Sequence, residues 1–181
     1  MSSGDYEYVA LIDESGEPGL RRVKPIDANG SSEWLIVSAV VLARPREAQA
    51  FTWANELLTI GGNRPTSPIH FKDLSNEKQK IVCRKMGSYP LRIFVAVSNK
   101  KNMKGHRNPF AARVSESLLG RLPNYRWLYY WMTRVLLEKV TRWVASRSML
   151  DFGEPKKLKI IFSQRGGISY EELGLYYDVL R

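Results

Sequence analysis

A short apolar segment that runs directly into two carboxylates constrains this chain more than any other feature. Tyr8–Ile12 is apolar, Asp13 and Glu14 follow it, and a Ser-Gly-Glu-Pro-Gly turn comes next. The aromatic and branched residues of this run predict a β-strand over Tyr6–Asp13. A strand that ends in acids places a carboxylate at the edge of a sheet, where a divalent cation can reach it. A plain strand followed by an acidic loop is the alternative interpretation.

The two acids are not equivalent as metal ligands. Adjacent residues on an extended strand point to opposite faces, so Asp13 and Glu14 cannot both bind one cation while the strand is extended. We therefore expect Asp13 to be the primary ligand. Three roles stay open for Glu14: a second ligand that turns in at Gly16, a ligand acting through water, or a structural acceptor.

Charge and residue usage narrow the partners and the metal. The 181 residues include 28 Lys and Arg against 18 Asp and Glu, and the net charge of +10 favours a polyanion such as nucleic acid or an anionic surface. With one cysteine, no internal disulfide and no thiolate zinc site can form. His70 and His106 are the two histidines. Any catalytic metal therefore needs mainly oxygen ligands, which suits Mg²⁺ or Mn²⁺.

The order of elements predicts an α/β fold. At 44% hydrophobic residues the chain can bury a core, and its length suits a single domain over residues 1–181. Strands alternate with helices after an initial pair of strands, which indicates a layered domain with a mixed sheet. The lone cysteine, and the lack of a leader or of about 20 consecutive apolar residues, suggest a cytoplasmic protein with no membrane span. The further strands are expected at 34–42, 91–97 and 158–162, and the helices at 46–60, 76–86 and 125–146.

A second group of chemically active residues precedes the helix that Ser75 is expected to cap. His70, Lys72 and Asp73 lie together between Pro68 and that helix. Free backbone N–H groups at such a position attract anions. Lys72 is suited to hold a phosphate and His70 to transfer a proton. A solvated lysine and a hydrogen-bonded histidine are the alternative interpretation.

Two basic segments are candidates for contact with a phosphate backbone. The first follows the 91–97 strand and contains Lys100, Lys101 and Lys104. The second is the Gly-rich turn after the 158–162 strand, which contains Arg165. Both segments also fit ordinary solvated loops.

Taken in order, these segments resemble the domain of unknown function 3800 family. The Ile12–Gly19 piece, the apolar strand at 35–42 and Ile69-His70-Phe71-Lys72 carry the resemblance, together with residues 98–103, the 125–140 helix and residues 162–167. The resemblance implies a ribonuclease H-like three-layer fold and a nuclease activity, associated with defence or mobile elements. It also implies a metal-bound carboxylate at Asp13 and functional roles for His70 and Lys72.

One part of the family pattern is missing. Members close with a helix carrying an aliphatic-Gln-Leu-Ala-Asp segment, whose Asp would complete the acidic site, and this chain has no such segment. Either that acid lies beyond Arg181 in a C-terminally incomplete domain, or the chain is a catalytically inactive version that binds nucleic acid or another partner. We expect a Mg²⁺- or Mn²⁺-dependent nuclease, with the binding-only domain as the alternative. Binding to an anionic protein or membrane surface ranks last, and the sequence does not indicate an oligomeric state.

Overall fold

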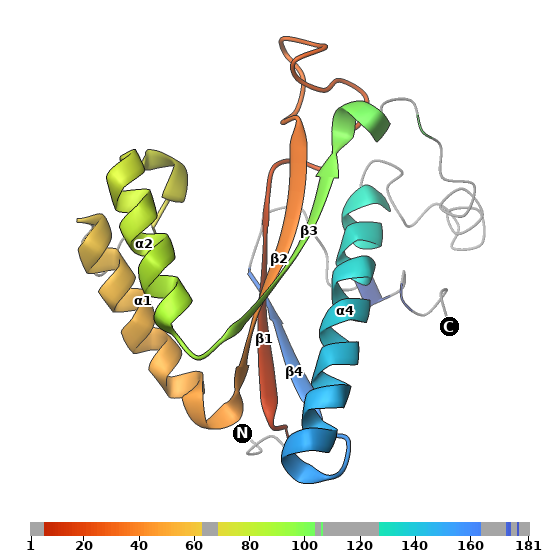
Figure 1. Cartoon of the computed structure of the whole chain (residues 1–181). Coiled ribbons are helices and arrows are strands. Elements are labelled where there is room, and N and C mark those ends of the chain that lie inside the picture. The colour runs from red at the N-terminus through yellow and green to blue at the C-terminus, as the bar shows by residue number, and fades with distance from the viewer. Residues whose placement is uncertain are drawn as a thin grey trace.

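A computed structural model describes residues 6–62, 69–103, 106, 127–163, 173–174 and 177 (Figure 1). The expected strand at 158–162 is found with the same bounds, and the other expected elements differ only at their ends. The elements are β1 (Tyr8–Ser15), β2 (Trp34–Ala43), η1 (Arg44–Arg46), α1 (Glu47–Gly61), η2 (Phe71–Asp73), α2 (Asn76–Ser88), β3 (Arg92–Asn99), η3 (Lys100–Met103), α4 (Trp127–Phe152) and β4 (Leu158–Phe162).

The four strands form one mixed sheet in the order β3-β2-β1-β4. β2 runs antiparallel to both β1 and β3, whereas β1 and β4 run parallel. The register pairs Asp13 with Ser38 and Ile12 with Phe162. The predicted α/β class with a mixed sheet is therefore confirmed.

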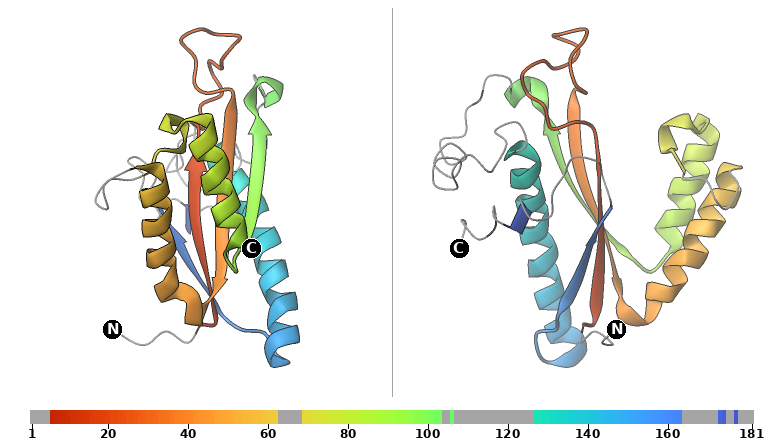
Figure 2. Two further views of the ribbon diagram at one scale, coloured as in Figure 1. Left: turned by 60° about the vertical axis from the view of Figure 1, so that its left-hand side comes forward. Right: turned by 180° about the vertical axis from the view of Figure 1, so that it is seen from behind.

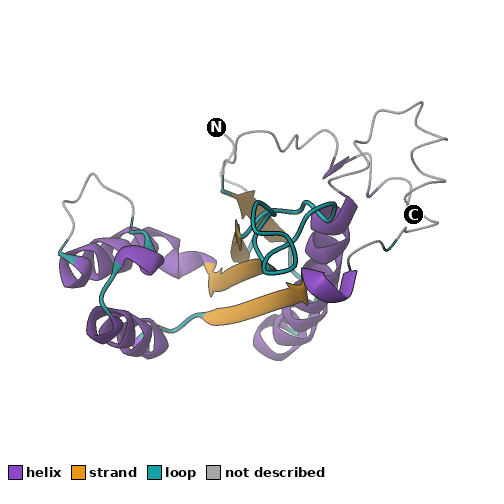
Figure 3. Cartoon of the chain, turned by 90° about the horizontal axis from the view of Figure 1, so that it is seen from above, coloured by secondary structure: helices purple, strands orange, loops and turns teal. Residues whose placement is uncertain are grey.

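Helix α4 covers one face of this sheet (Figure 3). Alternate residues of β1 and β2 point toward it, as the two-residue period of a strand requires. Their side chains interlock with one face of α4 and are at most 3% exposed. The main members of this core are Tyr8, Ala10, Ile12, Leu35, Val37, Ala39, Val41, Leu128, Met132, Leu136, Val140 and Val144.

The opposite face of the sheet is largely open. Helices α1 and α2 lie on this side and diverge from the strands (Figure 2). The expected packing of helices against both faces of the sheet is therefore found on the α4 face only. Apolar side chains of this face remain between 37% and 56% exposed; they are Leu11, Ile93, Val95, Val97 and Ile161. None of the described helices has the length and apolarity needed to cross a membrane.

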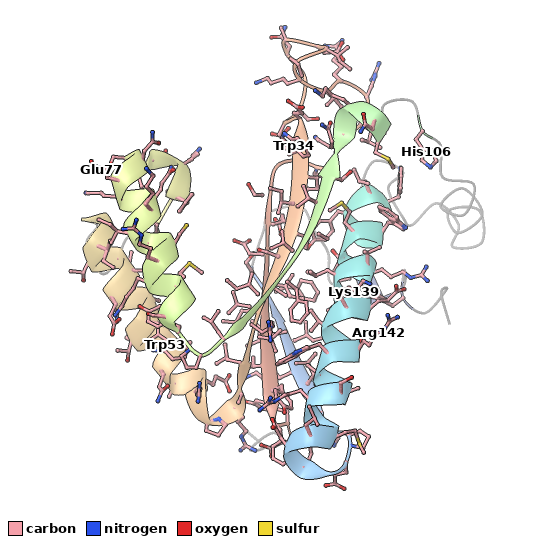
Figure 4. All side chains as sticks on the ribbon, in the orientation of Figure 1. Trp34, Trp53, Glu77, His106, Lys139 and Arg142 are labelled. Atoms are coloured by element: carbon pink, nitrogen blue, oxygen red, sulfur yellow. The ribbon has the colours of Figure 1, made fainter. Side chains whose placement is uncertain are left out.

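Helices α1 and α2 brace each other as a hairpin. The ring of Tyr89 stacks on Trp53 with centroids 4.9 Å apart, at the base of the hairpin (Figure 4). The Tyr89 hydroxyl donates to Glu56 Oε2 at 2.9 Å, and Lys85 Nζ lies 2.9 Å from the same oxygen. Ser75 Oγ accepts a hydrogen bond from the Lys78 backbone N–H, so the predicted helix cap is confirmed.

Candidate active site at the carboxyl ends of β1 and β4

An open pocket of about 720 Å³ lies where β1 and β4 end. Four predicted site residues line it together: Asp13 and Glu14 from β1, and His70 and Lys72 from the segment that leads into α2. The carboxyl ends of neighbouring parallel strands are where open α/β sheets bind their ligands. The remaining lining residues are Ser15, Gly16, Ile69, Phe71 and Ser163.

Asp13 is exposed on the open face of the sheet, and three strands fix its position. From β2, Ser38 Oγ donates to the Asp13 carbonyl oxygen at 3.3 Å. From the end of β4, the Ser163 backbone N–H donates to the carbonyl oxygen of Ile12 at 2.8 Å, and Ser163 Oγ donates to Asp13 Oδ1. The Ser163 hydroxyl therefore holds the Asp13 carboxylate at the rim of the pocket.

The turn after β1 requires a glycine at position 16. Gly16 has a φ of +91°, a conformation that L side chains rarely adopt. A Cβ at this position would lie 2.1 Å from the Trp34 carbonyl oxygen. Ser32 Oγ donates to that same oxygen at 2.9 Å. The turn that follows the two acids therefore lies in direct contact with the start of β2.

The opposite wall of the pocket comes from the tip of the α1–α2 hairpin. The Gln79 side-chain amide of α2 donates to the carbonyl oxygens of Phe71 at 3.0 Å and Leu74 at 3.2 Å. Leu74 is 9% exposed, whereas His70 and Lys72 are exposed. The helix therefore anchors the backbone of the tip and leaves the imidazole and the ammonium group facing outward, on the side of the acids.

The donor set fits a hard cation that retains most of its water. Among the described residues, no group of three or more His, Cys, Asp or Glu side chains is placed to hold a metal ion. Mg²⁺ is commonly bound by one or two carboxylates together with waters and substrate phosphates. Asp13 supplies one carboxylate to the pocket from the open face. Glu14 also lines the pocket, but it lies two residues after the core-facing Ile12 and therefore belongs to the other face of β1. An ion held by Asp13 takes most of its remaining ligands from water and phosphate, with Glu14 in an auxiliary place.

Lys100 does not have the role that the sequence predicted for it. Its side chain is 0% exposed, and its ammonium donates to the carbonyl oxygens of Glu17 at 2.6 Å and Gly19 at 3.2 Å and to Ser31 Oγ at 2.8 Å. Burial lowers the pKa of Lys100. All three donors are used inside the protein. Lys100 fixes the loop at 16–33 onto the end of β3 and is closed to a phosphate backbone, so this prediction is wrong.

The other predicted basic contacts divide into two groups. Lys101 remains partly exposed, and its Nζ lies 2.7 Å from Glu33 Oε1. Lys104 and Arg165 fall outside the described residues. The expected phosphate contacts of these three residues stay predictions.

Sequence reasoning missed two members of the pocket. Ser163 is the first: it has no carboxylate, yet its hydroxyl is the group that contacts Asp13. The position directly after a strand parallel to β1 was the available signal. Phe71 is the second: it lines the pocket, and it is 46% exposed. No sequence pattern distinguishes this residue from an aromatic residue of the core.

Compared with known proteins, the chain matches no family model, no curated protein and no solved structure.

Proposed function

We propose that this chain is a metal-dependent nuclease that hydrolyses phosphodiester bonds of DNA or RNA on a ribonuclease H-like fold. The observation that carries the proposal is the convergence of Asp13, Glu14, His70 and Lys72 on one open pocket. The strand order β3-β2-β1-β4, with β2 antiparallel to both neighbours, supports the proposed fold. The net charge of +10 supports a polyanionic substrate.

Each residue has a distinct task in this proposal. Asp13 holds a Mg²⁺ or Mn²⁺ ion, with Glu14 as the auxiliary acid. When bound, such an ion stabilises charge on the phosphoryl oxygens and lowers the pKa of attacking water. Lys72 binds a nonbridging phosphate oxygen from the opposite wall of the pocket. His70 donates a proton to the leaving oxygen, which otherwise departs as an alkoxide.

The direct test is cleavage of labelled single-stranded, duplex and hybrid oligonucleotides with Mg²⁺, Mn²⁺ or a chelator. We expect cleavage that requires the metal and falls about 100-fold or more in Asp13→Asn. Glu138→Gln is a matched control, because Glu138 is an exposed carboxylate on α4 that pairs with Arg134 at 2.8 Å. An Asp13→Asn protein that cuts as fast as the parent overturns the proposal.

A binding-only domain is the second candidate. It is favoured by one observation: among the described residues, no group of three or more His, Cys, Asp or Glu side chains is placed to hold a metal ion. In that case the protein binds oligonucleotides with the same affinity in chelator and in Mg²⁺, and no substrate is cleaved. Salt-sensitive binding is common to both candidates, so the metal dependence of cleavage separates them.

A further inference from the structure

Trp34 is a large aromatic side chain that stays 46% exposed at the start of β2, near the upper end of the sheet (Figure 4). The next residue, Leu35, is fully buried against α4. The alternation of the strand therefore places Trp34 on the open face. Asp13 lies on that same face, opposite Ser38 of the same strand. Ser38 and Trp34 are four positions apart on β2, or roughly 13 Å along the strand.

The backbone of Trp34 is fixed against the turn that follows the two acids of β1. Ser32 Oγ donates to its carbonyl oxygen at 2.9 Å, and Gly16 approaches that oxygen closely enough to leave no space for a Cβ. A rigid backbone lowers the entropy cost of using an exposed ring for binding. Trp34 is thus a fixed platform beside the pocket.

Phe71 is a second exposed ring, on the opposite wall. It is 46% exposed and lines the pocket directly. Its carbonyl oxygen accepts a hydrogen bond from the Gln79 side chain, which holds the backbone to α2. The sheet and the hairpin tip therefore each present one exposed ring on the side of the sheet that carries Asp13.

Each ring has a cation close to it in the chain or in the sheet. Lys72 follows Phe71 directly and lines the same pocket. Lys101 comes two residues after Asn99, which is the ladder partner of Trp34. The Lys101 ammonium forms an ion pair with Glu33 at 2.7 Å, and the Lys101 side chain remains partly exposed. An exposed ring next to a cation is the arrangement that stacks an unpaired base and holds its phosphate.

We infer that the substrate of this pocket is single-stranded, with unpaired bases stacked on Trp34 and Phe71 on either side of the phosphate at Asp13. This inference rests on the proposed function and adds the strandedness of the nucleic acid to it. In a duplex each base is already stacked on both faces, so neither ring meets a free base face. Stacking tolerates any base, so this arrangement gives preference for unpaired strands without sequence specificity.

The experiment measures equilibrium binding by fluorescence anisotropy in a chelator, where no cleavage occurs. The probes are a mixed-sequence strand of about 12 nucleotides, in DNA and RNA forms, the matching duplex, and an abasic strand of the same length. We expect the single strands to bind at least about tenfold more tightly than the duplex and the abasic strand. The DNA and RNA arms show which sugar the protein prefers.

Ring-removing variants locate the effect. Trp34→Leu and Phe71→Leu keep an apolar side chain and are each expected to weaken single-strand binding about tenfold, while duplex binding stays unchanged. Phe71→Tyr keeps a ring and is expected to bind single strands as tightly as the parent does. Phe51→Leu and Phe152→Leu are matched controls, because these rings are 75% and 47% exposed but belong to α1 and to the end of α4, not to β2 or the hairpin tip.

Two outcomes overturn the inference. One is equal affinity for the single strand and the duplex or abasic strand. The other is unchanged single-strand binding in both Leu variants. Either result leaves the proposed function standing, since metal-dependent cleavage that requires Asp13 is measured separately. Conversely, the parent protein could prefer single strands as expected and yet cleave no faster than Asp13→Asn. That result contradicts only the proposed catalytic role of Asp13.

Discussion

Ser163 donates its hydroxyl hydrogen to Asp13 Oδ1 where the parallel strands β1 and β4 end side by side. The two residues are 150 positions apart in the sequence, and the Ser163 backbone N–H is fixed on the carbonyl oxygen of Ile12. The serine therefore occupies the place from which a second carboxylate would share a cation with Asp13. The proposed ion consequently depends on Asp13, Glu14, water and the substrate phosphate.

Placing an acid at position 163 should tighten metal binding. Since Ser163→Asp adds a carboxylate beside Asp13, we expect Mn²⁺ to bind about tenfold more tightly, measured by calorimetry. Without metal the two carboxylates repel, so the Tm should fall at low salt. Ser163→Asn is the control, because asparagine has the size of aspartate but carries no charge. Equal Mn²⁺ affinity in the Asp and Asn variants contradicts a cation site at Asp13.

The turn after β1 should tolerate no side chain at Gly16. Because of its φ of +91° and the 2.1 Å approach to the Trp34 carbonyl oxygen, Gly16→Ala should lower the free energy of unfolding by about 2 kcal/mol or more. Gly87→Ala is the control, since a Cβ there meets nothing within 4 Å and Ala favours the α2 helix by about 0.5 kcal/mol. Urea unfolding measures both changes. Equal effects at the two glycines would contradict the close contact at Gly16.

Removing the buried ammonium of Lys100 should destabilise the protein. Lys100→Met removes the ammonium donor from three oxygen acceptors, of which the Gly19 carbonyl oxygen keeps the Ser31 hydroxyl at 2.7 Å, at a cost of about 2 kcal/mol in the free energy of unfolding. Lys101→Met is the matched control one residue away and should cost less than about 1 kcal/mol, because its ion pair with Glu33 is partly exposed. Chemical denaturation compares them. The opposite ranking would place Lys100 on the surface.

Local patterns were sufficient to predict most elements. The Ser75 cap and the β4 strand depend on residues within a few positions of one another, so the sequence contains their physical cause. The placement of Asp13 at the end of a strand, on the edge of the sheet, also followed from a general rule for α/β sheets. These parts of the fold needed no knowledge of distant contacts.

The errors come from contacts between residues far apart in the chain. Lys100 belongs to a run of cations that reads as a solvated loop, but its ammonium is enclosed by carbonyl oxygens 81 and 83 positions earlier. The open face of the sheet is a second example. The three-layer fold implied by the resemblance would cover both faces, whereas α1 and α2 pack on each other and leave Val95 and Val97 more than half exposed.

The α1–α2 hairpin carries a pH-sensitive contact at Tyr89. Burial, followed by the hydrogen bond to Glu56, raises the pKa of Tyr89 to about 12. The unfolded chain has an ordinary tyrosine pKa of about 10. Between these values the folded protein keeps the phenol proton and the unfolded chain loses it. The unfolded chain then binds fewer protons, so the stability from this group is complete below about pH 10 and is lost as the pH rises through about 12.

Comparing the parent with Tyr89→Phe isolates this effect, since the other titrating groups cancel in the difference. At pH 9 the parent should be more stable by about 1 kcal/mol, the value of the hydrogen bond to Glu56. The ring stack on Trp53 is retained in the variant, so the difference reports the hydroxyl group. Urea unfolding at intervals from pH 9 upward should show the difference shrinking above pH 10. A difference that stays constant to pH 12 would mean that Tyr89 titrates as an exposed tyrosine and that the hairpin is not closed by this contact.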